Sequence, residues 1–248
     1  MQKALITGAS GGIGRELSLT MAKAGHDLVL VSRNKVELTK VKDEIAVLSN
    51  VKVSIYTADL SVSGSALKLY NETRNENIEI LVNNAGVGLK GDFFHDDPTK
   101  TMALTQLNII SLVELSNLFG KDFLKNNRGK ILNVGSAVAF LPWPEQPVYA
   151  ASKAFVRSLS RALSYNLRDS NVTVTALHPG GTKTKFFKSS GDADISSGAS
   201  ASSVAELGYK AMMAGKIEVT HGVLNKFFTN VLVRFIPYRY HAYLIDKF

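Results

Sequence analysis

The sequence predicts a single α/β domain over residues 1–248, with one doubly wound parallel sheet covered by helices on both faces. Short apolar runs alternate with longer amphipathic stretches, which is the pattern of strands joined by crossover helices. The apolar runs are continuous rather than alternating, as expected for strands that are buried on both faces. A chain of 248 residues can bury one full core, and α/β folds of this size are commonly single domains.

The predicted strands are short apolar segments spread along the chain. They are Lys3–Thr7, Asp27–Val31, Lys52–Tyr56, Ile80–Val82, Lys130–Val134 and Thr173–Leu177, with Ile217–Thr220 as a candidate seventh. The predicted helices occupy long amphipathic stretches between strands. They are Gly12–Ala24, Lys35–Leu48, Thr99–Leu124 and Tyr149–Arg168.

Two regions break this alternation. Residues 183–203 are rich in Ser, Gly and Ala, and we expect a mobile substrate loop there. Residues 223–248 form an apolar and basic C-terminal extension that is too short and too charged to span a bilayer. The alternatives for this extension are packing on its own domain, packing on a partner subunit, or peripheral contact with a membrane through its aromatic and basic side chains.

Composition excludes several classes of function. The chain has no cysteine, which removes disulfides, thiolate nucleophiles and Cys-ligated zinc. Its five histidines lie far apart in the sequence, so we expect no metal site. The net charge is +8, but the Lys and Arg residues are scattered, and we expect no nucleic-acid partner. With no visible signal peptide, we expect a cytoplasmic location.

The first predicted strand leads directly into Thr7-Gly8-Ala9-Ser10-Gly11-Gly12-Ile13-Gly14 and a helix. In such a turn the backbone N–H groups and the helix N-terminus face a phosphate. Gly8 permits the tight turn, and Gly12 and Gly14 allow close approach of a cofactor and a neighbouring strand. The turn therefore predicts a dinucleotide site that includes Ser10 and Ile13.

The end of the second strand indicates which nicotinamide cofactor binds. An acidic residue there would accept the ribose 2′-hydroxyl of NAD(H), but the sequence has Ser32 followed by Arg33. A guanidinium can bind a 2′-phosphate through two hydrogen bonds. We therefore predict NADP(H) in preference to NAD(H). The alternative is that Arg33 is only a solvated loop residue.

Tyr149 and Lys153 are spaced i and i+4, which places them on one face of a helix. A free phenol has a pKa near ~10 and is a slow acid or base at neutral pH. A neighbouring ammonium and an oxidised nicotinamide both favour the phenolate. The pair therefore suits proton transfer, although such a spacing also occurs by chance on helix surfaces.

Taken together, the motifs resemble the classical short-chain dehydrogenase/reductase family over about three-quarters of the chain. The matching positions, in the family's order, are Thr7-Gly8, Gly12, Gly14, Asn83-Asn84-Ala85-Gly86, Asn108, Ser136, Tyr149, Lys153 and Pro179-Gly180. The resemblance implies a Rossmann-type sheet of about seven strands in the order 3-2-1-4-5-6-7. Many members that prefer NADP carry a base at the position of Gly11, so here the preference depends on Arg33.

The resemblance also implies roles for individual residues. In it, Asp59 and Leu60 flank the adenine, while Asn84, Ala85 and Gly86 line the cofactor. Thr184 holds the carboxamide with help from Thr182, following Pro179 and Gly180. Lys153 binds the nicotinamide ribose, Ser136 orients the substrate carbonyl, and Asn108 holds a water that links Lys153 to solvent. A surface-facing Asn108 is the structural alternative. Self-association as a homodimer or homotetramer through the long helices is expected in the same way.

The resulting expectation is an NADPH-dependent reductase of an aldehyde, ketone or oxo-acyl group, with Tyr149 as general acid. One alternative is an alcohol or hydroxysteroid-type dehydrogenase that uses the same residues in the oxidative direction. Another is an NADPH-binding redox sensor, which an incomplete Ser, Tyr and Lys set would have favoured. The loops expected at the carboxyl ends of the strands, where a substrate would bind, carry many apolar residues, which suggests an apolar pocket. They are Phe93, Phe94, Phe140, Leu141, Trp143, Phe186 and Phe187.

Overall fold

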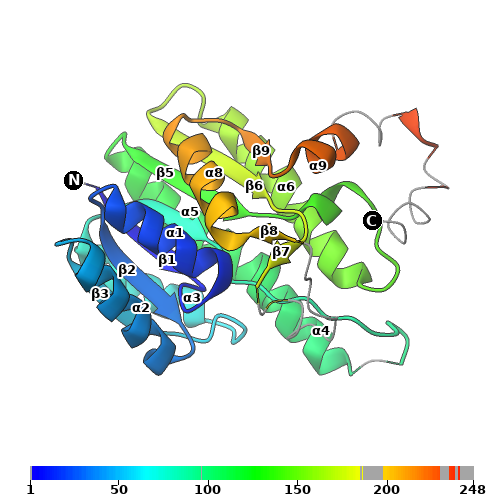
Figure 1. Ribbon diagram of the computed structural model, residues 1–248, viewed down its shortest axis with the longest axis horizontal. Coiled ribbons are helices and arrows are strands. Elements are labelled where there is room, and N and C mark those ends of the chain that lie inside the picture. The colour runs from blue at the N-terminus through cyan, green and yellow to red at the C-terminus, as the bar shows by residue number, and fades with distance from the viewer. Residues whose placement is uncertain are drawn as a thin grey trace.

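A computed structural model describes residues 2–95, 97–184, 186, 198–229, 235–237 and 240. Seven parallel strands form one sheet in the order β3-β2-β1-β4-β5-β6-β9, as Figure 1 shows. The strands are β1 (Lys3–Thr7), β2 (Asp27–Ser32), β3 (Val53–Thr57), β4 (Ile78–Asn83), β5 (Gly129–Val134), β6 (Val172–His178) and β9 (Glu218–Thr220). This confirms the predicted fold and strand order, with β9 as the seventh strand.

Helices cover both faces of the sheet. One face carries α1 (Gly12–Lys23), α2 (Lys35–Leu48) and α8 (Ala201–Met213), and the other carries α3 (Ser65–Thr73), α5 (Ser111–Lys125) and α6 (Pro147–Asn166). The remaining elements are short. They are η1 (Arg74–Glu76), α4 (Pro98–Thr105), η2 (Gln106–Ile110), η3 (Ala137–Phe140), β7 (Thr182–Lys183), β8 (Ala199–Ser200) and α9 (Val223–Phe227).

The continuous apolar runs are explained by two core layers. In β2, Leu28 and Leu30 pack into the cluster beneath α1 and α2, whereas Val29 and Val31 pack into the cluster on the opposite face. Successive side chains of a strand point to opposite faces, so both faces need apolar residues. Each fully buried aliphatic side chain contributes about 1.5–3 kcal/mol, which makes this sheet a rigid support for the loops at its ends.

The predicted helix Thr99–Leu124 is interrupted. It consists of α4, one π turn (η2) and α5, so the prediction of an uninterrupted α-helix is wrong at residues 106–110. The π turn contains Asn108, whose side chain is bonded outside the helix, and such turns are frequent at functional sites. The whole 28-residue segment is long and apolar enough to cross a membrane, but Phe119 and Phe123 are buried against the sheet.

The region predicted as a loop at 183–203 is partly regular. Thr182 and Lys183 of β7 pair with Ala199 and Ser200 of β8. Ser200 then caps α8 by accepting a hydrogen bond from the Ser203 amide, so the last residues of the region belong to a helix N-terminus. Residue 185 and residues 187–197, for which mobility was expected, lie outside the described part of the chain.

Candidate active site

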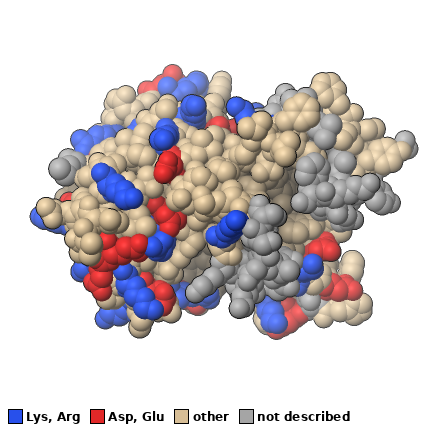
Figure 2. Space-filling model, viewed as in Figure 1, with Lys and Arg blue, Asp and Glu red and all other residues tan. Residues whose placement is uncertain are grey.

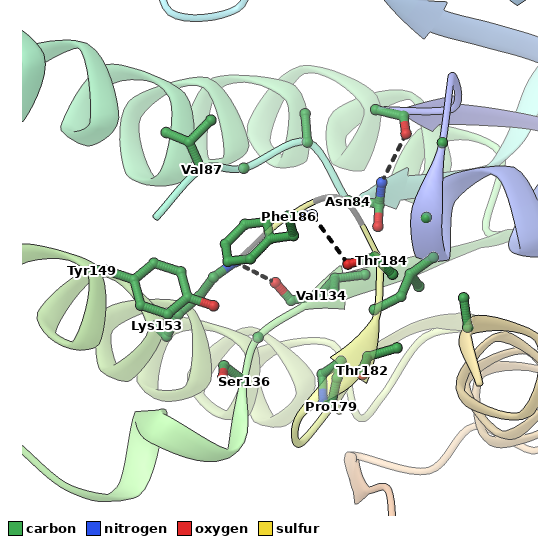
Figure 3. A pocket seen from close by; sticks show the side chains of 18 of the residues that line it. Asn84, Val87, Val134, Ser136, Tyr149, Lys153, Pro179, Thr182, Thr184 and Phe186 are labelled. Atoms are coloured by element: carbon green, nitrogen blue, oxygen red, sulfur yellow. Dashed lines mark hydrogen bonds between the residues drawn. The ribbon is translucent and has the colours of Figure 1, made fainter. Parts of the chain in front are cut away.

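The carboxyl ends of the strands open into a cavity of about 1170 Å³. Nearly all of the sequence-predicted site residues line it, and Figure 3 shows how several of them lie. They are Gly8, Ser10, Gly12, Ile13, Arg33, Asp59, Leu60, Asn84, Ala85, Gly86, Ser136, Tyr149, Lys153, Pro179, Gly180, Thr182 and Thr184. Gly14 and Asn108 lie behind this lining. The folded chain therefore brings residues between Gly8 and Thr184 together at one edge of the sheet.

The glycine turn is built so that backbone alone faces the cavity. Gly8 and Gly12 have φ of 66° and 53°, the left-handed region that favours glycine. A Cβ on Gly14 would lie only 2.2 Å from the Gly8 carbonyl oxygen, so Gly14 lets α1 pack against the turn. No side chain caps the N-terminus of α1 at Gly11, which leaves its first N–H groups facing the cavity. This cradle suits a pyrophosphate.

Asn84 joins the ends of β1 and β4. Its backbone amide donates to the Thr7 hydroxyl at 3.0 Å, and its side-chain amide donates to the Thr7 carbonyl at 2.9 Å. The Ala85 amide also donates to the Thr7 hydroxyl, at 3.0 Å. These bonds hold the Asn84-Ala85-Gly86 turn directly beside the glycine turn, and Figure 3 shows the Asn84 side chain on that wall.

Arg33 and Asp59 face each other where β2 and β3 end. Arg33 Nη1 lies 3.9 Å from Asp59 Oδ2, and the two side chains are 64% and 42% exposed. Burial raises the pKa of the Asp59 carboxyl, but hydrogen bonds from Ser61 and the charge of Arg33 outweigh it and leave the pKa below its usual value. A pair this long and exposed is weak, so the guanidinium can bind another anion.

Tyr149 and Lys153 extend from α6 into the cavity (Figure 3) and are only 7% and 6% exposed. The Lys153 ammonium donates to the Val134 carbonyl at 2.9 Å, and its nitrogen lies 5.7 Å from the centre of the Tyr149 ring. Pro147 at the first turn starts the helix, since a proline there lacks only an N–H that has no helical partner.

Burial governs the protonation of this pair. It raises the pKa of the Tyr149 phenol to about 12, although a hydrogen bond with the Ser136 side chain opposes the rise. It lowers the pKa of the Lys153 ammonium to about 8. The sequence argument favoured a lowered phenol pKa; here the pKa is raised instead, because burial dominates. At neutral pH the phenol is therefore protonated, as a proton donor must be.

Ser136 lies two residues beyond β5 and caps the short helix η3. Its hydroxyl accepts a hydrogen bond from the Val138 amide at 3.3 Å and interacts with the Tyr149 phenol. Two backbone bonds fix this turn to the end of β6: Gly135 N–H donates to Leu177 O, and Ala137 N–H donates to Pro179 O, each at 2.7 Å.

Asn108 is 2% exposed, so the surface-facing alternative is wrong. Its side-chain amide donates to the Val87 carbonyl at 2.9 Å and to the Ser152 hydroxyl at 3.1 Å, and its oxygen accepts from the Val87 amide at 3.0 Å. A Cβ on Gly86 would contact both Asn108 Oδ1 and Lys153 Nζ, which places Asn108 directly behind the cavity wall. Its expected role in holding a water stays a prediction.

The substrate side of the cavity is apolar, but not through all of the expected residues. The rings of Trp143 and Phe186 pack on the Tyr149 ring, at centroid distances of 6.4 and 5.6 Å, and Leu141 lines the same wall. Phe140 is not part of this wall, because its ring packs instead on the Arg157 guanidinium, behind the site. Phe93 and Phe94 line a separate hollow, and Phe187 lies outside the described residues.

Asn225 and Phe228 also line the cavity, although no sequence motif points to them. A Cβ on Gly180 would lie 2.0 Å from Asn225 Nδ2, so α9 sits directly against the Pro179-Gly180 turn. Part of the C-terminal extension thus packs on its own domain. On the other side of α9, Val223, Leu224 and Phe227 are exposed. Figure 1 shows α9 at the upper right of the molecule, where the surface in Figure 2 carries few charged side chains.

The family model described as short chain dehydrogenase matches residues 2–194. This chain is a short-chain dehydrogenase. Among curated relatives, 17-beta-hydroxysteroid dehydrogenase type 3 of Rattus norvegicus is 33% identical over 189 residues, which are 75% of this chain and 62% of the relative. Very-long-chain 3-oxoacyl-CoA reductase of Laccaria bicolor is 32% identical, covering 71% of this chain and 53% of the relative. The chain therefore spans less than two thirds of either protein.

Two solved dehydrogenase structures cover more of the chain. The enzyme of Sphingobium yanoikuyae in complex with NADPH has a TM-score of 0.86 and 30% identity, covering 94% of this chain and 91% of its own. The bulky-bulky ketone specific alcohol dehydrogenase of Comamonas testosteroni has a TM-score of 0.82 and 25% identity, covering 100% and 91%. The chain thus shares both the family and the fold of these solved enzymes.

Proposed function

We propose that this short-chain dehydrogenase reduces the carbonyl group of an apolar ketone or oxo-acyl compound with NADPH. The observation that carries the proposal is the buried, protonated Tyr149 phenol, which shares an apolar cavity with Ser136 and Lys153. The relatives named for steroid and 3-oxoacyl-CoA substrates support a large apolar substrate.

The cavity fits a nicotinamide dinucleotide. The uncapped N-terminus of α1 and the side-chain-free turn at Gly8, Gly12 and Gly14 would hold the pyrophosphate. Asp59 and Leu60 would contact the adenine, and Thr182 and Thr184 would contact the nicotinamide. When bound, NADPH would supply the hydride that reduces the carbonyl carbon.

The chain's own residues would orient the carbonyl and supply its proton. The Ser136 hydroxyl would hold the carbonyl oxygen beside the Tyr149 phenol, and such orientation lowers the activation barrier. The phenol would donate its proton to that oxygen. The Lys153 ammonium, fixed by Val134, would stabilise the phenolate that remains. Trp143 and Phe186 would exclude water from the phenol.

Preference for NADPH over NADH would depend on Arg33. Its guanidinium lines the cavity and, within the described part of the chain, makes one long ion pair, to Asp59, so it is available to a 2′-phosphate. The NADPH complex of the related Sphingobium enzyme supports this preference.

The reductive direction is favoured by the raised pKa of Tyr149, because a protonated phenol is ready to give a proton rather than to accept one. Oxidation of a hydroxysteroid by the same residues is the second candidate, supported by the relative named as a hydroxysteroid dehydrogenase.

We also propose that the enzyme works as a homodimer or homotetramer. The helical segment α4–η2–α5 and helix α6 expose apolar side chains that a second copy would cover: Met102, Ile110, Leu124, Phe155 and Tyr165. Sedimentation of a monomer at micromolar concentration would contradict this assignment.

The test of the proposed reaction is NADPH oxidation with a 17-ketosteroid, 3-oxoacyl-CoA esters and bulky aryl ketones. We expect turnover of at least one class, and Tyr149→Phe should lower kcat by about 10²–10⁴-fold while NADPH binding is retained. Tyr165→Phe is the matched control, because Tyr165 lies on the same helix and is 67% exposed. Turnover by Tyr149→Phe close to that of the wild type would refute the role of the phenol.

A further inference from the structure

A second cluster of charged and aromatic residues lies outside the cavity, behind Ser136. Arg157 follows Tyr149 and Lys153 on the same face of α6, at i+8 and i+4. Its guanidinium donates to Glu218 of β9, from Nε to Oε2 at 3.2 Å and from Nη2 to Oε1 at 3.5 Å. The two side chains are 23% and 27% exposed. Neither lines the catalytic cavity, so the proposed reaction leaves this pair unexplained.

The same guanidinium packs on the turn that carries Ser136. Its central carbon lies 4.0 Å from the centre of the Phe140 ring, in the last position of η3. That ring also contacts His178 at the end of β6, edge-on, with the ring centres 5.2 Å apart. Phe140 is therefore held between α6 and the sheet, at the far end of the helix that Ser136 caps.

His178 completes the cluster. It is fully buried, and its Nε2 lies 3.6 Å from Oε2 of Glu218. The His178 ring and the Arg157 guanidinium lower the pKa of the Glu218 carboxyl to about 2, which keeps it ionised. The His178 ring packs so closely on Gly135 that no side chain fits between them: a Cβ on Gly135 would lie 2.6 Å from Nδ1 of His178. Residues on α6, η3, β6 and β9 thus meet at one point, beside Gly135 just after β5.

We infer that Arg157, anchored by Glu218, is a positioning residue that holds the Ser136 turn in register with Tyr149. This inference rests on the proposed reduction, in which Ser136 orients the carbonyl. A partly buried ion pair is by itself weak evidence of stabilisation, because desolvation offsets its attraction. The planar guanidinium, however, binds the carboxylate in two places and stacks on Phe140, so it fixes a geometry that a lysine would not.

The first test measures the turn directly, without substrate or cofactor. Hydrogen exchange reports how firmly the Gly135 and Ala137 amides are bonded to the end of β6. In Arg157→Met we expect exchange in residues 135–140 to quicken by about tenfold while the β1 and β4 amides keep their rates. Arg161→Met is the control, because Arg161 lies exposed one turn further along α6. Unchanged exchange in residues 135–140 would overturn the inference.

The second test is a double-mutant cycle with Ser136→Ala, on the ketone that the wild type reduces fastest. Arg157→Met should lower kcat by about tenfold with NADPH binding unchanged, but should have little further effect when Ser136 is already alanine. Glu218→Gln keeps the shape of the side chain and should give a smaller loss with the same dependence on Ser136. Equal losses in both backgrounds would overturn the inference and leave the proposed reduction intact. Absence of wild-type turnover would instead count against the proposed function, and the exchange test would still decide the inference.

Discussion

The Lys153 ammonium donates a hydrogen bond to the Val134 backbone carbonyl at 2.9 Å, which ties helix α6 to the end of strand β5. The bond fixes Tyr149, one turn earlier on the helix, relative to Ser136, two residues beyond the strand. It also places a charged nitrogen in a site that is only 6% exposed. The bond therefore positions the proposed proton donor, and the burial of the ammonium that comes with it has an electrostatic cost.

That cost predicts a pH-dependent stability. Burial lowers the pKa of Lys153 from 10.5 to about 8, so between these values the unfolded chain binds a proton that the folded protein does not. Stability of the wild type relative to Lys153→Met should rise through this window, by on the order of 3 kcal/mol, and stay constant below pH 8. Urea unfolding at a series of pH values measures the difference. If the difference in stability between the wild type and Lys153→Met does not vary with pH, the lowered pKa of the buried Lys153 ammonium is contradicted.

The glycine turn offers a matched pair of substitutions. By helix propensity alone, Gly14→Ala should stabilise α1, but its Cβ would lie 2.2 Å from the Gly8 carbonyl oxygen. We expect it to destabilise the protein by about 1–3 kcal/mol and to weaken NADPH binding. Gly11→Ala should be neutral, because Gly11 is extended and its Cβ would meet nothing within 4 Å. Thermal unfolding and NADPH fluorescence check both, and equal behaviour of the two variants would contradict the packing argument.

Arg33→Asp tests the cofactor preference. A charge-assisted hydrogen bond is worth about 1.5–3 kcal/mol, so the NADPH/NADH ratio of kcat/KM should fall by about 10–100-fold. Lys35→Asp makes the same change of charge two residues away, outside the cavity lining, and should alter the ratio far less. If the two variants shift the ratio equally, the preference comes from overall charge rather than from Arg33.

The exposed face of α9 leads to a prediction about membranes. Leu224 and Phe227 are 80% and 57% exposed and flank Lys226, a combination that suits a lipid headgroup zone. We expect the protein to sediment with anionic vesicles, and Leu224→Ser combined with Phe227→Ser to reduce this without changing NADPH binding. Val47→Ser on α2 is the control, because Val47 is 87% exposed on a different helix. If the double variant sediments with vesicles as the wild type does, this face of α9 is ruled out as the membrane contact.

Much of the molecule could be predicted because its signals are local. The inner strands are continuous apolar runs that are buried on both faces, as that pattern requires, whereas the edge strands β3 and β9 are half-buried. The glycine turn and the Tyr149–Lys153 spacing are set by backbone geometry over a few residues, so neighbours in the sequence are enough to indicate them. Together these signals determined the fold class and the edge of the sheet where the site lies, while the strand order was implied by the family resemblance of the motifs.

Other features depend on segments that meet only in the folded chain. Asn108 lies in a π turn and its side chain binds Val87, a contact that no periodicity in its own helix indicates. Asn225 enters the cavity wall by packing on Gly180. The Arg157–Glu218 pair and the stacked Phe140 join α6, β9 and η3. The sequence by itself determined those features that local backbone geometry and the periodic burial of side chains can specify. The tertiary structure decided the long-range contacts, because these depend on how complete elements pack.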